Sequence, residues 1–158
     1  MTDIHAGDRL GDLRSRIDHW LDEFAVNNPL IASIDRGTSD DTSFGESRWY
    51  VRMLGEEKDF ITVWLTLGQR TLRYETYVMP APEENVEAVM EQLLRRNDQL
   101  VGVHFSIGLE NAVYLRGQLP DTAVTGDELD RVLGTLYATV EATFRPLLRL
   151  AFASRFAD

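Results

Sequence analysis

Apolar residues near the start of the chain recur at intervals of three and four positions, which is the spacing of an amphipathic helix. The stripe consists of Leu10, Leu13, Ile17, Trp20 and Phe24. Asp8 is the expected N-cap, and the Asn-Asn-Pro run at 27–29 is expected to end the helix. Two heptads are too few to indicate a coiled coil, so we expect this helix to pack against a sheet.

Apolar and polar residues then alternate in three segments, which predicts strands at about 47–54, 59–67 and 70–79. A two-residue turn at Gly68-Gln69 is expected to join the second and third strands. This register produces a mostly apolar face made of the pairs Leu65–Leu72, Val63–Tyr74 and Ile61–Thr76. The other face carries the pairs Trp64–Arg73, Thr62–Glu75 and Phe60–Tyr77.

The first of these strands tests the register, because its residues Trp49, Val51 and Met53 have to reach the same buried face. A turn with an even number of residues would direct them to the opposite face. A three-residue turn, with Leu54 opposite Lys58, directs them inward. We therefore expect a turn of odd length.

The stretch YVMPAPEENVEAVMEQLLRRND, at 77–98, predicts the end of a strand followed by a second helix. Pro80 ends the strand because it cannot donate a ladder hydrogen bond, and Pro82 suits the first turn of a helix. The expected buried stripe of this helix is Val86, Val89, Met90, Leu93 and Leu94.

Charged residues stand at both ends of this helix. Glu83 and Glu84 are expected at the positive end of its dipole, and Arg95 and Arg96 at the negative end. Asn97 is the expected left-handed cap. A dedicated ligand-binding role for the two arginines is the alternative, because arginine pairs can bind carboxylates.

Two more strands follow this helix. The apolar positions of the first are Val101, Val103, Phe105, Ile107 and Leu109. A short turn near Glu110-Asn111 leads into a strand at 113–117, and Pro120 ends the sheet.

The last helix begins at a capping box formed by Thr125 and Glu128. Its stripe is Leu129, Val132, Leu133, Leu136 and Val140. Pro146 is expected to kink or break this helix near Arg145.

These elements predict one α+β domain over residues 1–158, in which residues 1–7 are expected to be flexible. One antiparallel sheet of about five strands carries helices on one face, in the order α-β-β-β-α-β-β-α. A single core is expected to contain Leu93, Leu136, Ile61, Val63, Leu65 and Phe105.

The composition narrows the classes of function. The chain has no cysteine, which excludes disulfides and thiolate zinc sites. Its formal net charge of −10 disfavours nucleic acid and anionic membrane surfaces as partners. No segment resembles a signal peptide, and no apolar run is long enough to cross a bilayer. We expect a cytoplasmic protein.

Motifs for catalysis and cofactor binding are absent from the sequence. It contains no Gly-rich phosphate loop, Rossmann fingerprint, G-x-S-x-G elbow or H-E-x-x-H pattern. His5, His19 and His104 are too scattered to indicate a metal site. We therefore expect that the protein is not an enzyme, has no catalytic residues and binds neither a metal nor a cofactor.

The polar loop at 35–47 is the one segment whose acidic residues suggest a cation. Asp35, Asp40, Asp41 and Glu46 could in principle gather one, but their spacing does not match a calcium loop. A solvated loop is the favoured interpretation.

The order of elements, taken with three quoted segments, resembles the YbjN family, and more particularly an actinobacterial member. The segments are WYVRMLGEEKDFITVWLTLGQRTLRYETYVMPAPEENVEAVMEQLLRRND, VHFSIGLENAVYLRGQLP and TGDELDRVLG, within about 47–135. PAPEEN and LLRRN are the most distinctive phrases. The resemblance implies a fold similar to that of type III secretion chaperones.

The same resemblance implies a regulator of sensory transduction without assigned catalytic residues. It also implies binding of another polypeptide, commonly by a homodimer. The word chaperone refers here to the similarity of the fold and not to a known role in secretion. We therefore expect a non-catalytic protein-binding module. The alternative is a small-molecule sensor whose ligand lies between the sheet and the helices.

A partner surface is expected on the sheet face opposite the core. Its residues are Tyr50, Arg52, Phe60, Trp64, Arg73 and Tyr77, together with Thr62 and Glu75. Trp, Tyr and Arg are the side chains enriched in binding hot spots. The alternative is a solvated face stabilised by the cross-strand pairs Trp64–Arg73 and Phe60–Tyr77.

Overall fold

The computed structural model describes residues 2–37 and 46–156, without the side chains of residues 2–8. Within these residues the strands are β1 (Ile31–Arg36), β2 (Ser47–Leu54), β3 (Phe60–Leu67), β4 (Thr71–Met79), β5 (His104–Ile107) and β6 (Val113–Pro120). The α-helices are α1 (Thr2–Asn27), α2 (Val86–Asn97) and α3 (Gly126–Ala151), and the 3-10 turn η2 spans Leu109–Asn111. The strands form one antiparallel sheet in the spatial order β1-β2-β3-β4-β6-β5.

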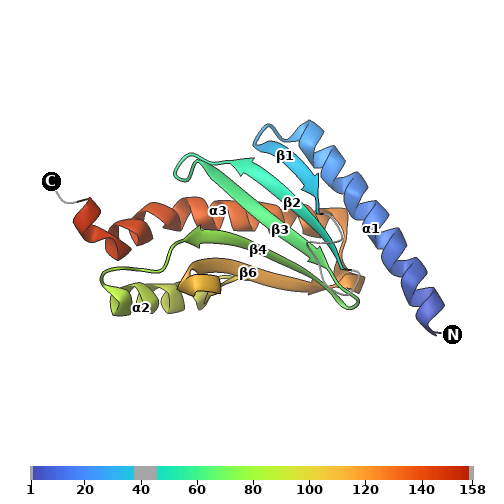
Figure 1. Cartoon of the computed structure of the whole chain (residues 1–158). Helices are drawn as coiled ribbons and strands as arrows, with labels where there is room; N and C mark the ends of the chain where they lie inside the picture. The colour runs from blue at the N-terminus through green and yellow to red at the C-terminus, as the bar shows by residue number, and fades with distance from the viewer. Residues whose placement is uncertain (1, 38–45, 157–158) are drawn as a thin grey trace.

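The helices cover one face of this sheet (Figure 1). α3 runs behind the strands and contacts β3 and β4, whereas α1 lies at the β1 end. α2 lies at the other end, against β5 and α3. The predicted α+β fold, an antiparallel sheet with helices on one face, is confirmed.

The sheet contains one strand that the sequence pattern did not predict. β1 pairs with β2 through a register irregularity between Ile31 and Ser33. Because of this bulge, the residues opposite the buried Met53 and Val51 are Ile31 and Ile34, which are three positions apart instead of two. The alternation that identifies a strand is lost there.

The predicted faces of β3 and β4 are confirmed, but the predicted turn is wrong. The backbone N–H of Gly68 donates to Thr71 O at 2.9 Å, which leaves Gln69-Arg70 as the turn. Leu65 is consequently opposite Tyr74, two residues from the predicted partner. A shift of two residues preserves both faces, because side chains alternate with a period of two.

The turn between β2 and β3 also differs from the predicted one by an even number of residues, so the faces of the strands are again preserved. Trp49, Val51 and Met53 are buried as predicted, so the odd parity of the turn is confirmed. Leu54, however, is opposite Phe60 and not opposite the predicted Lys58.

The boundaries of two helices differ from the predictions. α1 begins at Thr2, so Asp8 lies inside the helix and is not its N-cap. The predicted cap of α3 is confirmed, because the Thr125 hydroxyl accepts from the backbone N–H of Glu128 at 3.1 Å. α3 does not break at Pro146 but continues to Ala151, since Leu147 and Ala151 are both held in the core.

The acidic pair before α2 does not serve the helix dipole. α2 begins only after Asn85, whose left-handed conformation (φ 52°) separates the pair from the helix. Glu83 instead binds Arg155 at 2.8 Å, and the Glu84 carboxylate accepts from the backbone N–H of Ser154 at 2.8 Å. The pair therefore holds the segment that follows α3.

Several predicted apolar positions around α2 and β5 are not buried. In α2, Val89 and Leu93 are buried, whereas Val86 and Leu94 are exposed. β5 is limited to four residues, of which Phe105 is buried. The remaining predicted positions exposed outside the core are Val101, Ile107 and Leu109.

One hydrophobic core fills the space between the sheet and the helices. All six residues predicted for it belong to it: Leu93, Leu136, Ile61, Val63, Leu65 and Phe105. The sheet face away from the helices carries none of them, which leaves that face available for other contacts.

Candidate functional site

The six predicted partner residues lie on the sheet face away from the helices. Within β2, β3 and β4 they alternate with buried core residues. Tyr50 is opposite Trp64, and Trp64 is opposite Glu75, so these residues form one row across the strands. Arg52, Phe60 and Arg73 are exposed, and Tyr50, Trp64 and Tyr77 are half-buried. We call this surface the open face.

An aromatic cluster forms the centre of the open face. The Tyr114 ring, from β6, lies 6.3 Å from the Trp64 ring and 5.6 Å from the Tyr77 ring, the latter edge-on. Tyr114 is only 7% exposed because its neighbours cover it. Such pairs favour a fixed arrangement of the rings. The open face therefore has a rigid apolar centre.

The predicted cross-strand pairs on the open face are wrong because of the two-residue shift in register. Arg73 lies opposite Thr66 instead of Trp64. Phe60 is covered by the guanidinium of Arg52, 3.7 Å from the ring centroid, instead of lying beside Tyr77.

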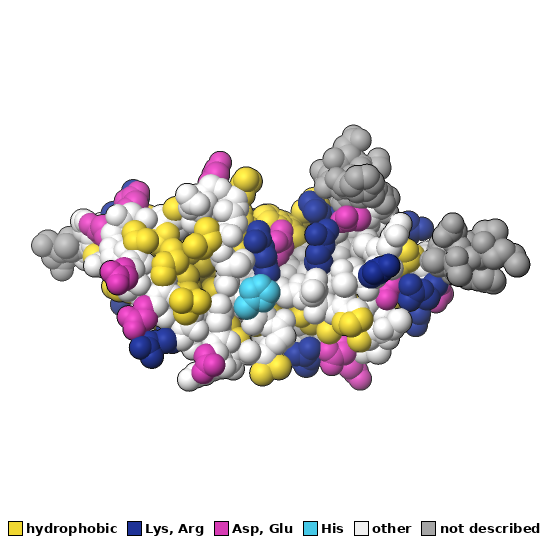
Figure 2. Space-filling view, turned by 90° about the horizontal axis from the view of Figure 1, so that it is seen from below, with side chains coloured by type: hydrophobic (Ala, Val, Ile, Leu, Met, Phe, Trp, Pro, Cys, Tyr) yellow, Lys and Arg dark blue, Asp and Glu magenta, His cyan; other side chains and the backbone are white. Residues whose placement is uncertain are grey.

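Ion pairs surround the aromatic cluster. Arg116 binds Glu75 at 2.7 Å and donates to the Ser106 hydroxyl at 3.2 Å, and its guanidinium lies 4.5 Å from the centroid of the Tyr114 ring. Arg73 binds Glu46 at 2.7 Å. In Figure 2, basic and acidic side chains accordingly stand side by side above the histidine in view.

A hollow of about 470 Å³ opens between these ion pairs. It is lined by Arg73, Tyr74, Glu75, His104, Arg116, Gly117 and Gln118. Its two arginines are already paired with carboxylates, so a ligand carboxylate here would have to exchange with Glu75 or Glu46.

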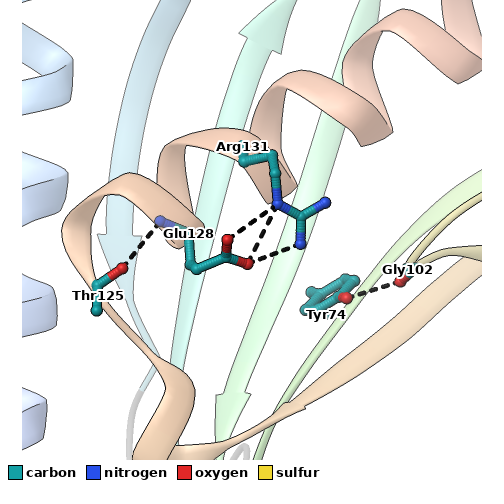
Figure 3. Close-up of polar contacts among 5 residues, drawn as sticks. All are labelled: Tyr74, Gly102, Thr125, Glu128 and Arg131. Atoms are coloured by element: carbon teal, nitrogen blue, oxygen red, sulfur yellow. Dashed lines mark hydrogen bonds and ion pairs between the residues drawn. The ribbon is translucent and has the colours of Figure 1, made fainter.

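Tyr74, which lines this hollow, ties the sheet to the turn before β5, and an ion pair within α3 lies nearby (Figure 3). The Tyr74 hydroxyl donates to Gly102 O at 2.7 Å, and burial raises the pKa of this tyrosine. Arg131 binds Glu128 at 2.7 Å, and this ion pair lowers the pKa of Glu128. A Cβ at position 117 would clash with Gly102 O and the Tyr74 ring, so Gly117 permits the contact. These contacts hold the turn before β5 against the sheet.

Lys58, the one lysine of the chain, has an unusual position in the turn between β2 and β3. Its ammonium donates to Tyr77 O at 2.6 Å and to Val78 O at 3.3 Å. Burial lowers its pKa to about 8. The Glu141 carboxylate holds the same turn by accepting from the backbone N–H of Glu57 at 2.9 Å. Lys58 therefore fixes the turn to β4, while α3 holds it from the other side.

The other sequence-based candidates are not brought together. Arg95 pairs with Glu91 on its own helix at 2.9 Å, which favours a structural role. In the described part of the chain, no three His, Asp or Glu side chains are grouped so that they could share a metal ion. Asp40 and Asp41 lie outside the described residues, so the loop prediction stays untested.

The cavity between α1, β1 and α3 bears on the small-molecule alternative. Its volume is about 90 Å³, and its walls include Phe24, Ile31, Met53, Leu133 and Tyr137. Ligand pockets usually have about 300–1,000 Å³. This cavity is therefore too small for an ordinary metabolite.

Helices that could cross a membrane are not found within the described ranges.

Three comparisons relate this chain to known proteins. The model of the YbjN family, described as "Putative bacterial sensory transduction regulator", matches residues 14–149. Rv0487 of Mycobacterium tuberculosis, described as an uncharacterized protein, is 41% identical over 104 residues, which cover 66% of this chain and 57% of that protein. This chain thus spans less than two thirds of the relative's length.

The fold is similar to a chain of the heterodimeric ExoU-SpcU complex from the type III secretion system of Pseudomonas aeruginosa. The TM-score is 0.54 at 16% identity, over 83% of this chain and 96% of that chain. The Yersinia pestis type III secretion chaperone SycH, in complex with a fragment of YscM2, gives a TM-score of 0.48 at 18% identity, over 80% and 97%.

Proposed function

Because this chain belongs to the YbjN family, we propose that it is a non-catalytic, cytoplasmic protein-binding module with a regulatory or chaperone-like role. The observation that carries the proposal is the open face, where Trp64, Tyr77 and Tyr114 form a rigid aromatic centre beside exposed arginines. Trp, Tyr and Arg are enriched among the few residues that supply most of the binding energy of a protein interface. A homodimer is part of this proposal.

The charge of the open face favours an acidic polypeptide as the partner. Among the described residues of the strands and of the segment before β2, this face carries the arginines Arg48, Arg52, Arg73 and Arg116 and the carboxylates Asp35, Glu46 and Glu75; Arg73 pairs with Glu46, and Arg116 with Glu75. The whole chain has a formal charge of −10, so the rest of its surface repels an acidic segment. Such a segment would be directed to the open face, where the arginines can exchange their intramolecular carboxylates for those of the partner.

Capture from a native lysate tests this role. Tagged wild-type protein is expected to retain a stoichiometric polypeptide, and Arg52→Glu/Arg73→Glu is expected to reduce its capture at least tenfold. Both arginines are exposed, whereas Trp64 and Tyr77 pack on Tyr114, so replacing the aromatic residues would also lower stability.

Arg14→Glu/Arg16→Glu on α1 is the matched control, because it makes the same change of charge at two exposed positions away from the sheet. Equal loss of capture in both variants would show that net charge, and not the open face, governs binding. A metabolite that co-purifies in place of a polypeptide, seen by native mass spectrometry, would contradict the proposal.

A further inference from the structure

α3 extends past the strands at the end of the molecule where the β2–β3 turn lies (Figure 1). A hollow of about 280 Å³ opens along this part of the helix. It is lined by Glu57, Phe144, Arg145, Leu148, Arg149 and Phe156. We call this hollow the α3 groove. It is separate from the open face, because α3 covers the opposite side of the sheet.

Three apolar side chains form the walls of the α3 groove. Phe144 and Leu148 stand one turn apart on α3, and both pack against the core while remaining half-buried. Phe156, which follows α3, is 51% exposed. The volume of the groove is close to the lower limit of ligand pockets, about 300 Å³. Walls that include two aromatic rings suit a small ligand with a ring of its own.

One positive charge in the α3 groove is not neutralised. Arg145 and Glu57 form an ion pair with each other. Arg149 is exposed, and in the part of the chain that the structure describes its side chain makes no hydrogen bond or ion pair. Glu56 and Glu141 do not line the groove, and the Glu141 carboxylate accepts from the backbone of the β2–β3 turn. The lining therefore carries one positive charge in excess, in a chain whose formal charge is −10.

The PAPEEN segment, at 80–85, fixes the position of Phe156. The backbone N–H groups of its two glutamates donate to Ala151 O, at the end of α3, at 3.1 and 2.9 Å. Their carboxylates hold the segment after α3, in which the backbone N–H of Phe156 donates to Ala153 O at 3.1 Å. The groove is therefore formed before a ligand arrives, which lowers the entropic cost of binding.

Two larger hollows among the described residues do not combine a free arginine with apolar walls. The concavity beside α2 carries the three carboxylates of Glu87, Glu91 and Asp98 and one arginine, which pairs with Glu91. In the hollow of the open face, both arginines are paired with carboxylates. An unpaired guanidinium binds a ligand carboxylate without first releasing one of the protein's own.

We propose that the α3 groove binds a small aromatic carboxylate. The ligand carboxylate pairs with Arg149, and its ring lies among Phe144, Leu148 and Phe156. The sequence-based alternative placed a small ligand between the sheet and the helices, whereas this groove lies between α3 and the segment that follows it. The ligand is bound in addition to the polypeptide partner, because the groove and the open face lie on opposite sides of the sheet.

Isothermal titration of the full chain with phenylacetate tests the proposal. We expect one saturable site with a dissociation constant of about 1 mM or tighter, because the ligand buries one ring and forms one ion pair. Phenylacetamide has the same shape without the charge and is expected to bind about tenfold more weakly. Acetate, which lacks the ring, is expected to bind about tenfold more weakly as well.

Two substitutions assign the binding to the groove. Arg149→Gln and Phe156→Ala are each expected to weaken the binding of phenylacetate about tenfold, and both residues are exposed, so the fold is retained. Arg14→Gln on α1 is the matched control, because Arg14 is also exposed and without a hydrogen bond or ion pair in the described ranges. It is expected to bind like the wild-type protein. Circular dichroism confirms that each variant is folded.

Amide chemical shifts locate the bound acid, and we expect them to change at 144–149 and at Phe156. No saturable binding up to roughly 10 mM, equal binding of phenylacetate and phenylacetamide, or wild-type affinity in Arg149→Gln would overturn the proposal. Shifts confined to 116–118 would also overturn it, because the acid would then lie in the hollow of the open face. Capture of a polypeptide is measured separately, so either proposal can fail without the other.

Discussion

Asn97→Ala isolates the energetic value of the contact that closes the edge of β5. The substitution removes two hydrogen bonds and leaves the N–H and C=O of the buried residue Phe105 without their partner. Each such bond contributes about 0.5–1.5 kcal/mol net. The better helix propensity of alanine offsets up to about 0.7 kcal/mol. We therefore expect a loss of about 1–2 kcal/mol in the free energy of unfolding.

Chemical denaturation measures this loss, and hydrogen exchange reports whether the amide of Phe105 becomes unprotected. Gln92→Ala is the control for a change to alanine on the same helix, because Gln92 is exposed; its gain in helix propensity is smaller than that at Asn97. If Asn97→Ala is no less stable than Gln92→Ala, or if the Phe105 amide keeps its protection, the hydrogen bonds are not what holds β5. An unblocked edge also predicts larger assemblies in Asn97→Ala, visible by light scattering.

Three other substitutions test the close contact at Gly117, an open position on α3 and the burial of Lys58. Gly117→Ala is expected to lower the free energy of unfolding by about 1–3 kcal/mol, because its Cβ would clash with Gly102 O and the Tyr74 ring. Gly134→Ala is expected to raise it by about 0.5–1 kcal/mol, because a Cβ there meets nothing within 4 Å. Thermal unfolding of the two variants measures both changes. Lys58 has a folded pKa of about 8 against 10.5 unfolded, so between these values the unfolded chain keeps a proton that the folded chain has released. The free energy of unfolding of the wild-type protein should therefore rise from pH 8 to pH 10 relative to that of Lys58→Met. If the free energies of the two proteins change in parallel with pH, the pKa of Lys58 is not lowered by burial.

The faces of the strands could be predicted from the sequence because side-chain alternation fixes them independently of the exact register. A turn displaced from Gly68-Gln69 to Gln69-Arg70 changed every cross-strand partner and moved no residue between faces. β1 escaped prediction for the opposite reason. Its bulge between Ile31 and Ser33 changes the period itself, so the local pattern no longer indicates a strand.

The sequence predicts which residues of a single strand lie on the candidate site, but not which strands lie next to each other there. All six predicted residues share the open face, but Tyr114 was missed because no local pattern shows that β6 lies between β4 and β5. The same limit applies to Asn97. Its position at the end of a helix suggested a left-handed cap, and its actual contact with Phe105 arises from the way α2 packs against β5.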